Sequence, residues 1–254
     1  MNNPMDSPFL VFALSLFILW FSERIGAFLH RRRRMEEQVR EDFGVILAAT
    51  LTLLGLIIGF SFSMAISRYD QRKNFEEAEA NAIGTEYLRA DVLPSLDGAK
   101  VRALLKRYLD RRVLFYKTRD QQQLRQIDTD TVQLQAELWA AVRTSASAQP
   151  SPLSALAVAG MNDVLNSQEY TQAAWWNRIP IAAWILLAVI AIFCNLMVGY
   201  GARRPDAGAI LLLVLPLVVS ISFLLIADID SPRGGVIHVR PQNLVSLSQS
   251  LHAY

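Results

Sequence analysis

The sequence predicts an all-α membrane protein with four transmembrane helices and a helical soluble domain inserted between the second and the third. Hydrophobic residues make up 52% of the 254 residues. They gather in four apolar runs, each long enough to cross a bilayer as a helix. A long charged stretch separates the second run from the third, and its apolar residues recur at helical spacing.

The first apolar run predicts a transmembrane helix over residues 8–29. A secretory signal peptide carries basic residues ahead of its apolar segment, whereas residues 1–7 contain no Lys or Arg. A basic block follows the run, formed by Arg31, Arg32, Arg33 and Arg34. We interpret this block as a topology signal, with specific binding of lipid as the alternative.

The second span, residues 44–66, is predicted to continue as one helix into the soluble domain and to end near Val92, because Pro94 stops it. Four small residues in this helix share one face, each four positions after the last: Gly55, Gly59, Ser63 and Ser67. Small residues let another transmembrane helix approach closely. This face is therefore predicted to pack against a helix, and lining a pathway is the alternative.

The soluble domain is predicted to contain three further helices, over residues 97–117, 120–144 and 153–177, with a loop over residues 144–152. Asp97 is the expected N-cap of the first, and Ser151 followed by Pro152 starts the third. Five basic residues of the first helix are expected to lie mostly on a solvated face, with attraction of anions as the alternative: Arg102, Lys106, Arg107, Arg111 and Arg112.

The third and fourth spans are predicted over residues 179–200 and 208–227, with Arg203 and Arg204 in the loop between them. Asn195, a strongly polar side chain inside the third span, is expected to hydrogen-bond a neighbouring helix, with a pore position as the alternative. In the tail, Asp228 and Asp230 are expected to serve in capping and interface hydration. Residues 236–239 are read as a short strand or extended segment, and residues 243–253 as a last helix.

The domain organisation that follows has four parts: residues 8–66, 67–178, 179–227 and 228–254. Arginines of the two short loops lie on the same side, and the N-terminal tail has none. Because basic short loops stay in the cytoplasm, both termini and the helical domain are predicted to lie outside.

The sequence excludes several classes of function. A net charge of +2 does not indicate a nucleic-acid partner, and one cysteine with three scattered histidines provides neither a disulfide nor a metal cluster. No catalytic motif is visible, so neither an enzyme nor a cofactor is predicted.

Three stretches resemble a family of bacterial four-span membrane proteins called the bestrophin-like or DUF4239 family. They are LLGLIIGFSFSMAISRYDQR (53–72), EEAEANAIGTEYLRADVLP (76–94) and ADIDSPRGGVIHV (227–239). The similarity to true bestrophins is more distant and implies a homo-oligomer, a pentamer, that conducts small anions with its second span lining the pore. Those channels keep the inserted domain in the cytosol, whereas the arginines here predict it outside. The acidic run that binds calcium in animal bestrophins is missing.

Two functions follow as hypotheses. In an oligomeric ion channel of the bacterial inner membrane, Ile58, Phe62 and Ile66 would form a hydrophobic neck on the second span. Their alternative role is ordinary contact with lipid or core. The second hypothesis is a non-conducting scaffold or sensor whose helical domain binds a partner.

Overall fold

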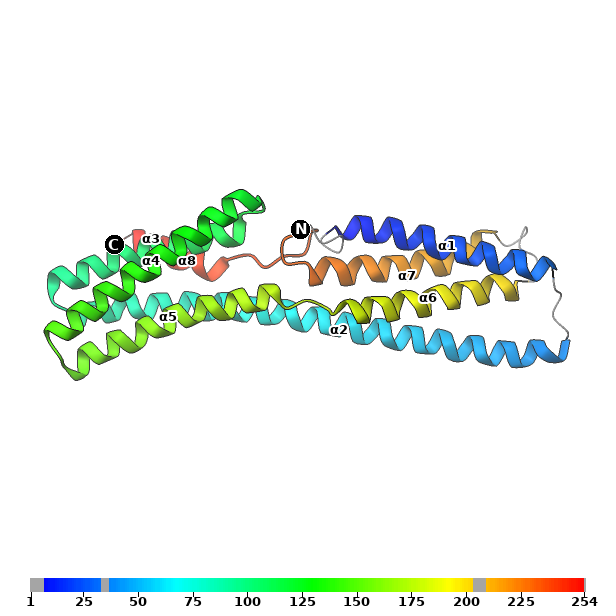
Figure 1. Ribbon diagram of the computed structural model, residues 1–254, viewed down its shortest axis with the longest axis horizontal. Coiled ribbons are helices and arrows are strands. Elements are labelled where there is room, and N and C mark those ends of the chain that lie inside the picture. The colour runs from blue at the N-terminus through cyan, green and yellow to red at the C-terminus, as the bar shows by residue number, and fades with distance from the viewer. Residues whose placement is uncertain (1–6, 33–36, 203–208, 254) are drawn as a thin grey trace. The chain divides into compact units, whose positions relative to one another are not determined.

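The computed structural model describes residues 7–32, 37–202 and 209–253, and regular structure in these ranges is helical throughout (Figure 1). This confirms the predicted fold class. The helices are α1 (Pro8–Arg32), α2 (Glu37–Arg89), the 3-10 turn η2 (Ala90–Val92), α3 (Ser95–Lys117), α4 (Gln121–Ala148), α5 (Pro152–Trp176), α6 (Ile181–Gly201), α7 (Ala209–Asp230) and α8 (Gln242–His252). Within the described ranges, four stretches that overlap α1, α2, α6 and α7 are long and apolar enough to cross a membrane.

The chain forms two compact units. The membrane unit comprises Met1–Tyr69 and Arg178–His238, and the helical unit comprises Asp70–Asn177 and Val239–Tyr254. Helix α2 belongs to both, because it runs for 53 residues without a break. The predicted continuation of the second span into the soluble domain is therefore confirmed, and the tail is divided between the two units.

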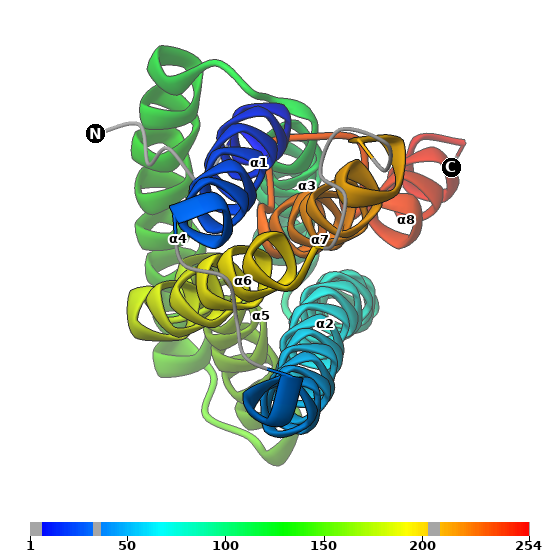
Figure 2. The same cartoon turned by 90° about the vertical axis from the view of Figure 1, so that its right-hand side faces the viewer.

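In the membrane unit, α1 packs against α6 and α7, and α2 lies on the other side of α6 (Figure 2). The α1–α6 crossing depends on two glycines. A Cβ atom at Gly26 would collide with the backbone oxygen of Leu196, and one at Gly199 with that of Glu23. All four helices contribute to one apolar core, whose fully buried members include Leu19, Ala65, Leu187 and Ile226. Close helix approach at small residues is the expected way to hold helices together in lipid.

In the helical unit, α4 packs against both α3 and α5 around a core that includes Leu105, Leu138 and Met161. Ser151 caps α5 as predicted, directly before Pro152. Its side chain accepts a hydrogen bond from the backbone N–H of Ser154, and its own backbone N–H donates to the Ser154 hydroxyl. Two local expectations are wrong. Helix α3 starts at Ser95, directly after Pro94, so Asp97 lies in its first turn and caps nothing. Helix α4 extends to Ala148, which shortens the predicted loop.

The segment after α7 bends over residues 232–236 and forms no strand among the described residues. Its backbone N–H groups bind a carboxylate instead of a neighbouring strand. Val236 N and Ile237 N donate to Asp228 at 2.7 and 3.2 Å. Gly235 permits this turn, because its φ is +76° and a side chain there would collide with Asp228. Asp228 therefore fixes the start of the tail.

Candidate functional site

The membrane half of α2 has one buried face. Leu54, Ser61 and Ala65 on this face are at most 3% exposed, and Leu54 and Ala65 belong to the apolar core of the membrane unit. These positions are spaced by seven and four residues, so they fall on a single side of the helix. The opposite side of α2 is left open within the chain.

The small residues Gly55, Gly59, Ser63 and Ser67 lie on this open side, and all four are exposed. A Cβ atom added at Gly55 or Gly59 would meet no atom within 4 Å. Within the membrane unit, therefore, no described helix packs against this face. A helix that packs there must come from another molecule.

Ile58, Phe62 and Ile66 lie along the edge between the two sides of α2. Ile58 is half-buried and packs against the apolar core, whereas Phe62 and Ile66 are 37% and 38% exposed. The structure thus places these three side chains on one flank of the helix. Phe62 and Ile66 are exposed enough there to contact another molecule. Their role as a pore lining stays a prediction.

Asn195 on α6 is fully buried. Its Nδ2 donates to Ala191 O at 2.8 Å, one turn earlier in the same helix, and its Oδ1 has no hydrogen-bond partner among the described residues. The side chain is thus enclosed by its unit and away from the open side of α2.

Of the basic residues assigned to topology or lipid, Arg31 is exposed at the end of α1. Arg33, Arg34, Arg203 and Arg204 lie outside the described residues.

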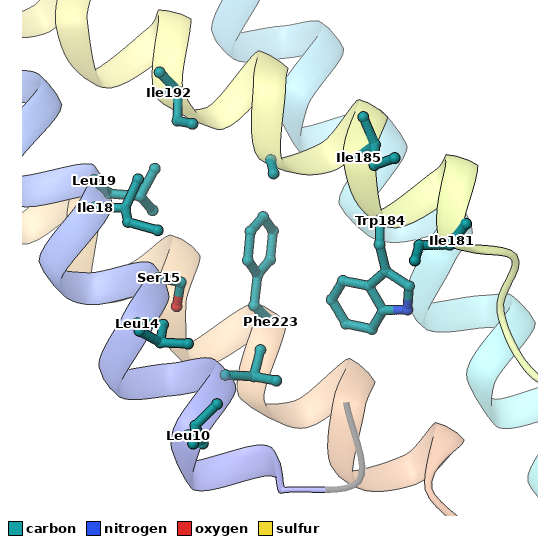
Figure 3. Close-up of a pocket in the computed structure, with 12 residues that line it drawn as sticks. Leu10, Leu14, Ser15, Ile18, Leu19, Ile181, Trp184, Ile185, Ile192 and Phe223 are labelled. Carbon is teal, nitrogen blue, oxygen red and sulfur yellow. The ribbon is translucent and has the colours of Figure 1, made fainter. Parts of the chain in front are cut away.

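An apolar cavity of about 340 Å³ opens between α1, α6 and α7 in the membrane unit (Figure 3). Trp184 and Phe223 meet inside it edge to face, with ring centroids 6.1 Å apart. Ser15 provides the one hydroxyl among the described residues that line it, and this hydroxyl already donates to Phe12 O. Such a lining provides no ligand for an ion, so this cavity suits hydrocarbon.

The helical unit contains a buried polar cluster that sequence reasoning missed. Glu79 on α2 forms an ion pair with Arg112 on α3, and both side chains are fully buried. The same carboxylate accepts hydrogen bonds from Tyr116 at 3.4 Å and Thr171 at 3.1 Å. Arg112 was expected on a solvated face, and this expectation is wrong. The partner lies 33 residues away, so local periodicity could not reveal the pair.

Two further carboxylates of α2 are buried in this unit. Glu76 accepts from the backbone N–H of Leu244 at 2.9 Å and from Asn243 at 2.7 Å, which holds the start of α8. Glu86 is fully buried against Gly160 of α5, and its oxygens have no hydrogen-bond partner among the described residues. Burial raises the pKa of Glu86 to about 8. The described residues contain no cluster suited to a metal ion.

Comparison with known proteins agrees with this architecture. The chain resembles a crystal structure of a bacterial bestrophin homologue from Klebsiella pneumoniae at 13% identity and a TM-score of 0.63, over 96% of this chain and 97% of that one. A point mutant of that homologue matches at 12% identity and a TM-score of 0.63, over 99% and 98% of the two chains. A crystallised membrane protein with another point mutation matches at 13% identity and 0.66, over 95% and 97%.

No curated protein matches the sequence. The structural likeness, at this identity, shows the fold. The family follows from the sequence itself, because the model of the bestrophin-like domain matches residues 9–244. The resemblance noted from the three sequence stretches is confirmed at this level, and the chain belongs to the bestrophin-like family.

Proposed function

We propose that the protein is an oligomeric ion channel of the bacterial inner membrane, in which α2 lines the pore and small anions are the permeant ions. The observation that carries the proposal is the open side of α2. The face of Gly55, Gly59, Ser63 and Ser67 is exposed, and no described residue lies within 4 Å of a Cβ atom added at either glycine. Family membership supports the channel, and the resemblance to bestrophins supports a pentamer.

The open side of α2 and the edge beside it suit the two surfaces that a helix has in a ring. The small residues permit close approach by a neighbouring protomer. The large side chains of Phe62 and Ile66, with Ile58 above them, suit an apolar constriction that controls conduction by dewetting. Residues 44–66 contain no Asp, Glu, Lys or Arg, so selectivity in this neck would not come from a charged ring.

Reconstitution into planar bilayers tests this proposal. The protein is purified in detergent, imaged to identify a ring with an axial passage, and its single-channel conductance is measured with and without a chloride gradient. We expect the double variant Phe62→Ala/Ile66→Ala to conduct more than wild type, because smaller side chains widen and wet the neck. A reversal potential near that of chloride would support anion permeation.

A matched control removes the same two side-chain types elsewhere in the membrane unit. Phe193 on α6 and Ile221 on α7 are 58% and 41% exposed, and Phe193→Ala/Ile221→Ala should leave conductance unchanged. Bilayers that stay silent with wild type and with the neck variant would contradict the channel. A monomer or compact dimer in detergent would favour the non-conducting scaffold instead.

A further inference from the structure

A second cavity of the membrane unit lies at the end where α1 and α6 finish and α2 begins (Figure 1). Its volume is about 370 Å³. Nine residues of four helices and one helix end line it: His30, Arg40, Phe43, Gly44, Leu47, Val198, Gly201, Ala202 and Leu212. Because the spans end here, the cavity lies at the level of the membrane–water interface.

The polar groups of this cavity are basic. Arg40 reaches from α2 to the last turn of α6, where its Nη2 donates to Gly201 O at 3.5 Å. A guanidinium has five N–H donors, so this single long hydrogen bond leaves donors for a bound ligand. His30 stands edge-on to Tyr200, with ring centroids 5.7 Å apart. Its Nδ1 has no hydrogen-bond partner among the described residues.

The acidic residues nearest to Arg40 in sequence do not line the cavity. Glu41 and Asp42 follow directly on α2 and are exposed, but neither is among the nine lining residues. The positions that line it, Arg40, Phe43, Gly44 and Leu47, recur at three- and four-residue spacing and so share one face of the helix. Among the described residues that line the cavity, the charged or titratable ones are therefore basic, and none is a carboxylate.

The remaining walls are apolar, from Phe43, Leu47, Val198 and Leu212. Phe43 also contacts the ring of Tyr200, at 5.8 Å between centroids. A Cβ atom placed at Gly44 would meet no atom within 4 Å, so this glycine leaves open space at the cavity wall. A cation above apolar walls at the interface is the combination that binds a lipid by its phosphate and its first acyl carbons.

We propose that this cavity binds an anionic phospholipid, with the phosphate on Arg40 and His30 and the start of an acyl chain against Phe43 and Leu47. Arg31, which is exposed at the end of α1, adds positive charge at the same end of the spans. Phosphate groups and guanidinium donors match in geometry and charge. The proposal concerns lipid recognition and does not depend on conduction.

Binding is measured on the full-length protein in neutral detergent, as the shift in the midpoint of thermal unfolding while short-chain phosphatidylglycerol is titrated. Short-chain phosphatidylcholine and soluble glycerol phosphate are titrated in parallel. We expect phosphatidylglycerol to stabilise wild type and phosphatidylcholine to have a much smaller effect. Arg40→Gln should weaken the apparent affinity for phosphatidylglycerol about fivefold, the usual contribution of one interfacial cation.

Two variants separate the cavity from charge in general. Gly44→Leu changes no charge but fills the open space, and it should also weaken binding. Arg119→Gln removes an exposed arginine of the helical unit and should bind like wild type. If Gly44→Leu is not recovered folded, Arg40→Gln decides alone, because that side chain is only half-buried and makes one long hydrogen bond.

Three results would overturn the proposal. Equal stabilisation by phosphatidylglycerol and phosphatidylcholine would show that the cavity does not distinguish an anionic headgroup from a zwitterionic one. Equal losses in Arg40→Gln and Arg119→Gln would show a diffuse charge effect outside the cavity. A full shift with glycerol phosphate alone would assign the site to a free phosphate ester instead of a lipid.

Discussion

At the scale of single residues, three buried carboxylates on α2 have three different environments. Glu79 forms an ion pair with Arg112, and a buried charge is tolerated only beside an opposite one. Glu76 holds backbone and side-chain N–H groups at the start of α8. The oxygens of Glu86 have no hydrogen-bond partner among the described residues, and burial raises its pKa to about 8. Near neutral pH, Glu86 is therefore mostly protonated in the folded protein.

This protonation makes stability depend on pH in a definite direction. The pKa of Glu86 is higher in the folded state than the ordinary value of 4.5, so the folded state binds a proton that the unfolded state has released. Stability should then fall as pH rises from about 5 to about 8. The Glu86→Gln variant has no carboxyl group to titrate at this position. Its unfolding midpoint should therefore fall less over that pH range than the midpoint of wild type. Thermal unfolding followed by tryptophan fluorescence at each pH measures this.

The charges that face Glu86 decide how clear the result is. Arg89 on the same helix lowers its pKa, and Asp163 on α5 raises it, both by less than burial does. Because Arg89 and Asp163 also pair with each other at 3.8 Å, their effects partly cancel. Glu77 is exposed on the same helix, and Glu77→Gln is the matched control. Parallel pH curves for wild type and Glu86→Gln would refute the protonated state.

At the scale of elements, α2 should tolerate a large side chain at Gly59 in the protomer but not in the assembly. A Cβ atom there meets nothing in its own chain, so Gly59→Leu should fold. In a ring, the new side chain would push apart helices that meet at this face, and overpacking of this kind costs about 1–3 kcal/mol per contact. Size-exclusion chromatography with light scattering should show smaller oligomers than for wild type.

Gly199 on α6 provides the contrast. Its missing side chain is required inside the chain, where a Cβ atom would collide with the backbone of α1, so Gly199→Leu should reduce folded yield itself. An unchanged oligomer in Gly59→Leu would remove this face of α2 from the subunit interface. Loss of folding in both variants would mean that the α2 face packs within the protomer.

Most of the helices could be predicted from the sequence, because the causes of a helix are local. Apolar runs, Pro94 and the Ser151–Pro152 start give bounds within a few residues of those of α1, α5 and α6. Which small residues join helices within the chain could not be predicted from the sequence. Gly26 is the only glycine of α1, and Gly199 is followed in α6 by Gly201, so neither helix has glycines four residues apart. The pairing of Gly26 with α6 and of Gly199 with α1 depends on how the two helices cross. The regularly spaced Gly55 and Gly59 lie instead on a face that no described helix contacts.

The same limit applies to polar side chains. Arg112 has the spacing of a solvated residue until Glu79, far away in sequence, is brought beside it. The basic cavity likewise combines His30, Arg40 and Gly201 from three helices, and none of them forms a motif in sequence. Local patterns therefore predict elements, and long-range packing decides which side chains meet.

At the scale of the whole molecule, the side of the membrane on which the helical unit lies remains a prediction that distinguishes this chain from the bestrophin arrangement. The arginines of the two short loops predict the helical unit outside, whereas the bestrophin resemblance implies the cytosol. The same prediction would put the basic cavity next to the cytoplasmic leaflet, where anionic lipids give the surface its negative potential. Orientation thus bears on both proposals.

Trypsin added to intact spheroplasts tests the orientation. Lys117 and Arg119 are exposed beside the short connection between α3 and α4, so a helical unit that faces outward should be cut there without lysis. Fragment sizes on an immunoblot report the cut, and Lys117→Gln/Arg119→Gln should abolish that fragment while the protein stays in the membrane. A cytosolic marker protein that survives intact shows that the spheroplasts are closed. If cleavage at this connection requires opened cells, the helical unit is cytosolic, and the short-loop arginines do not set the topology.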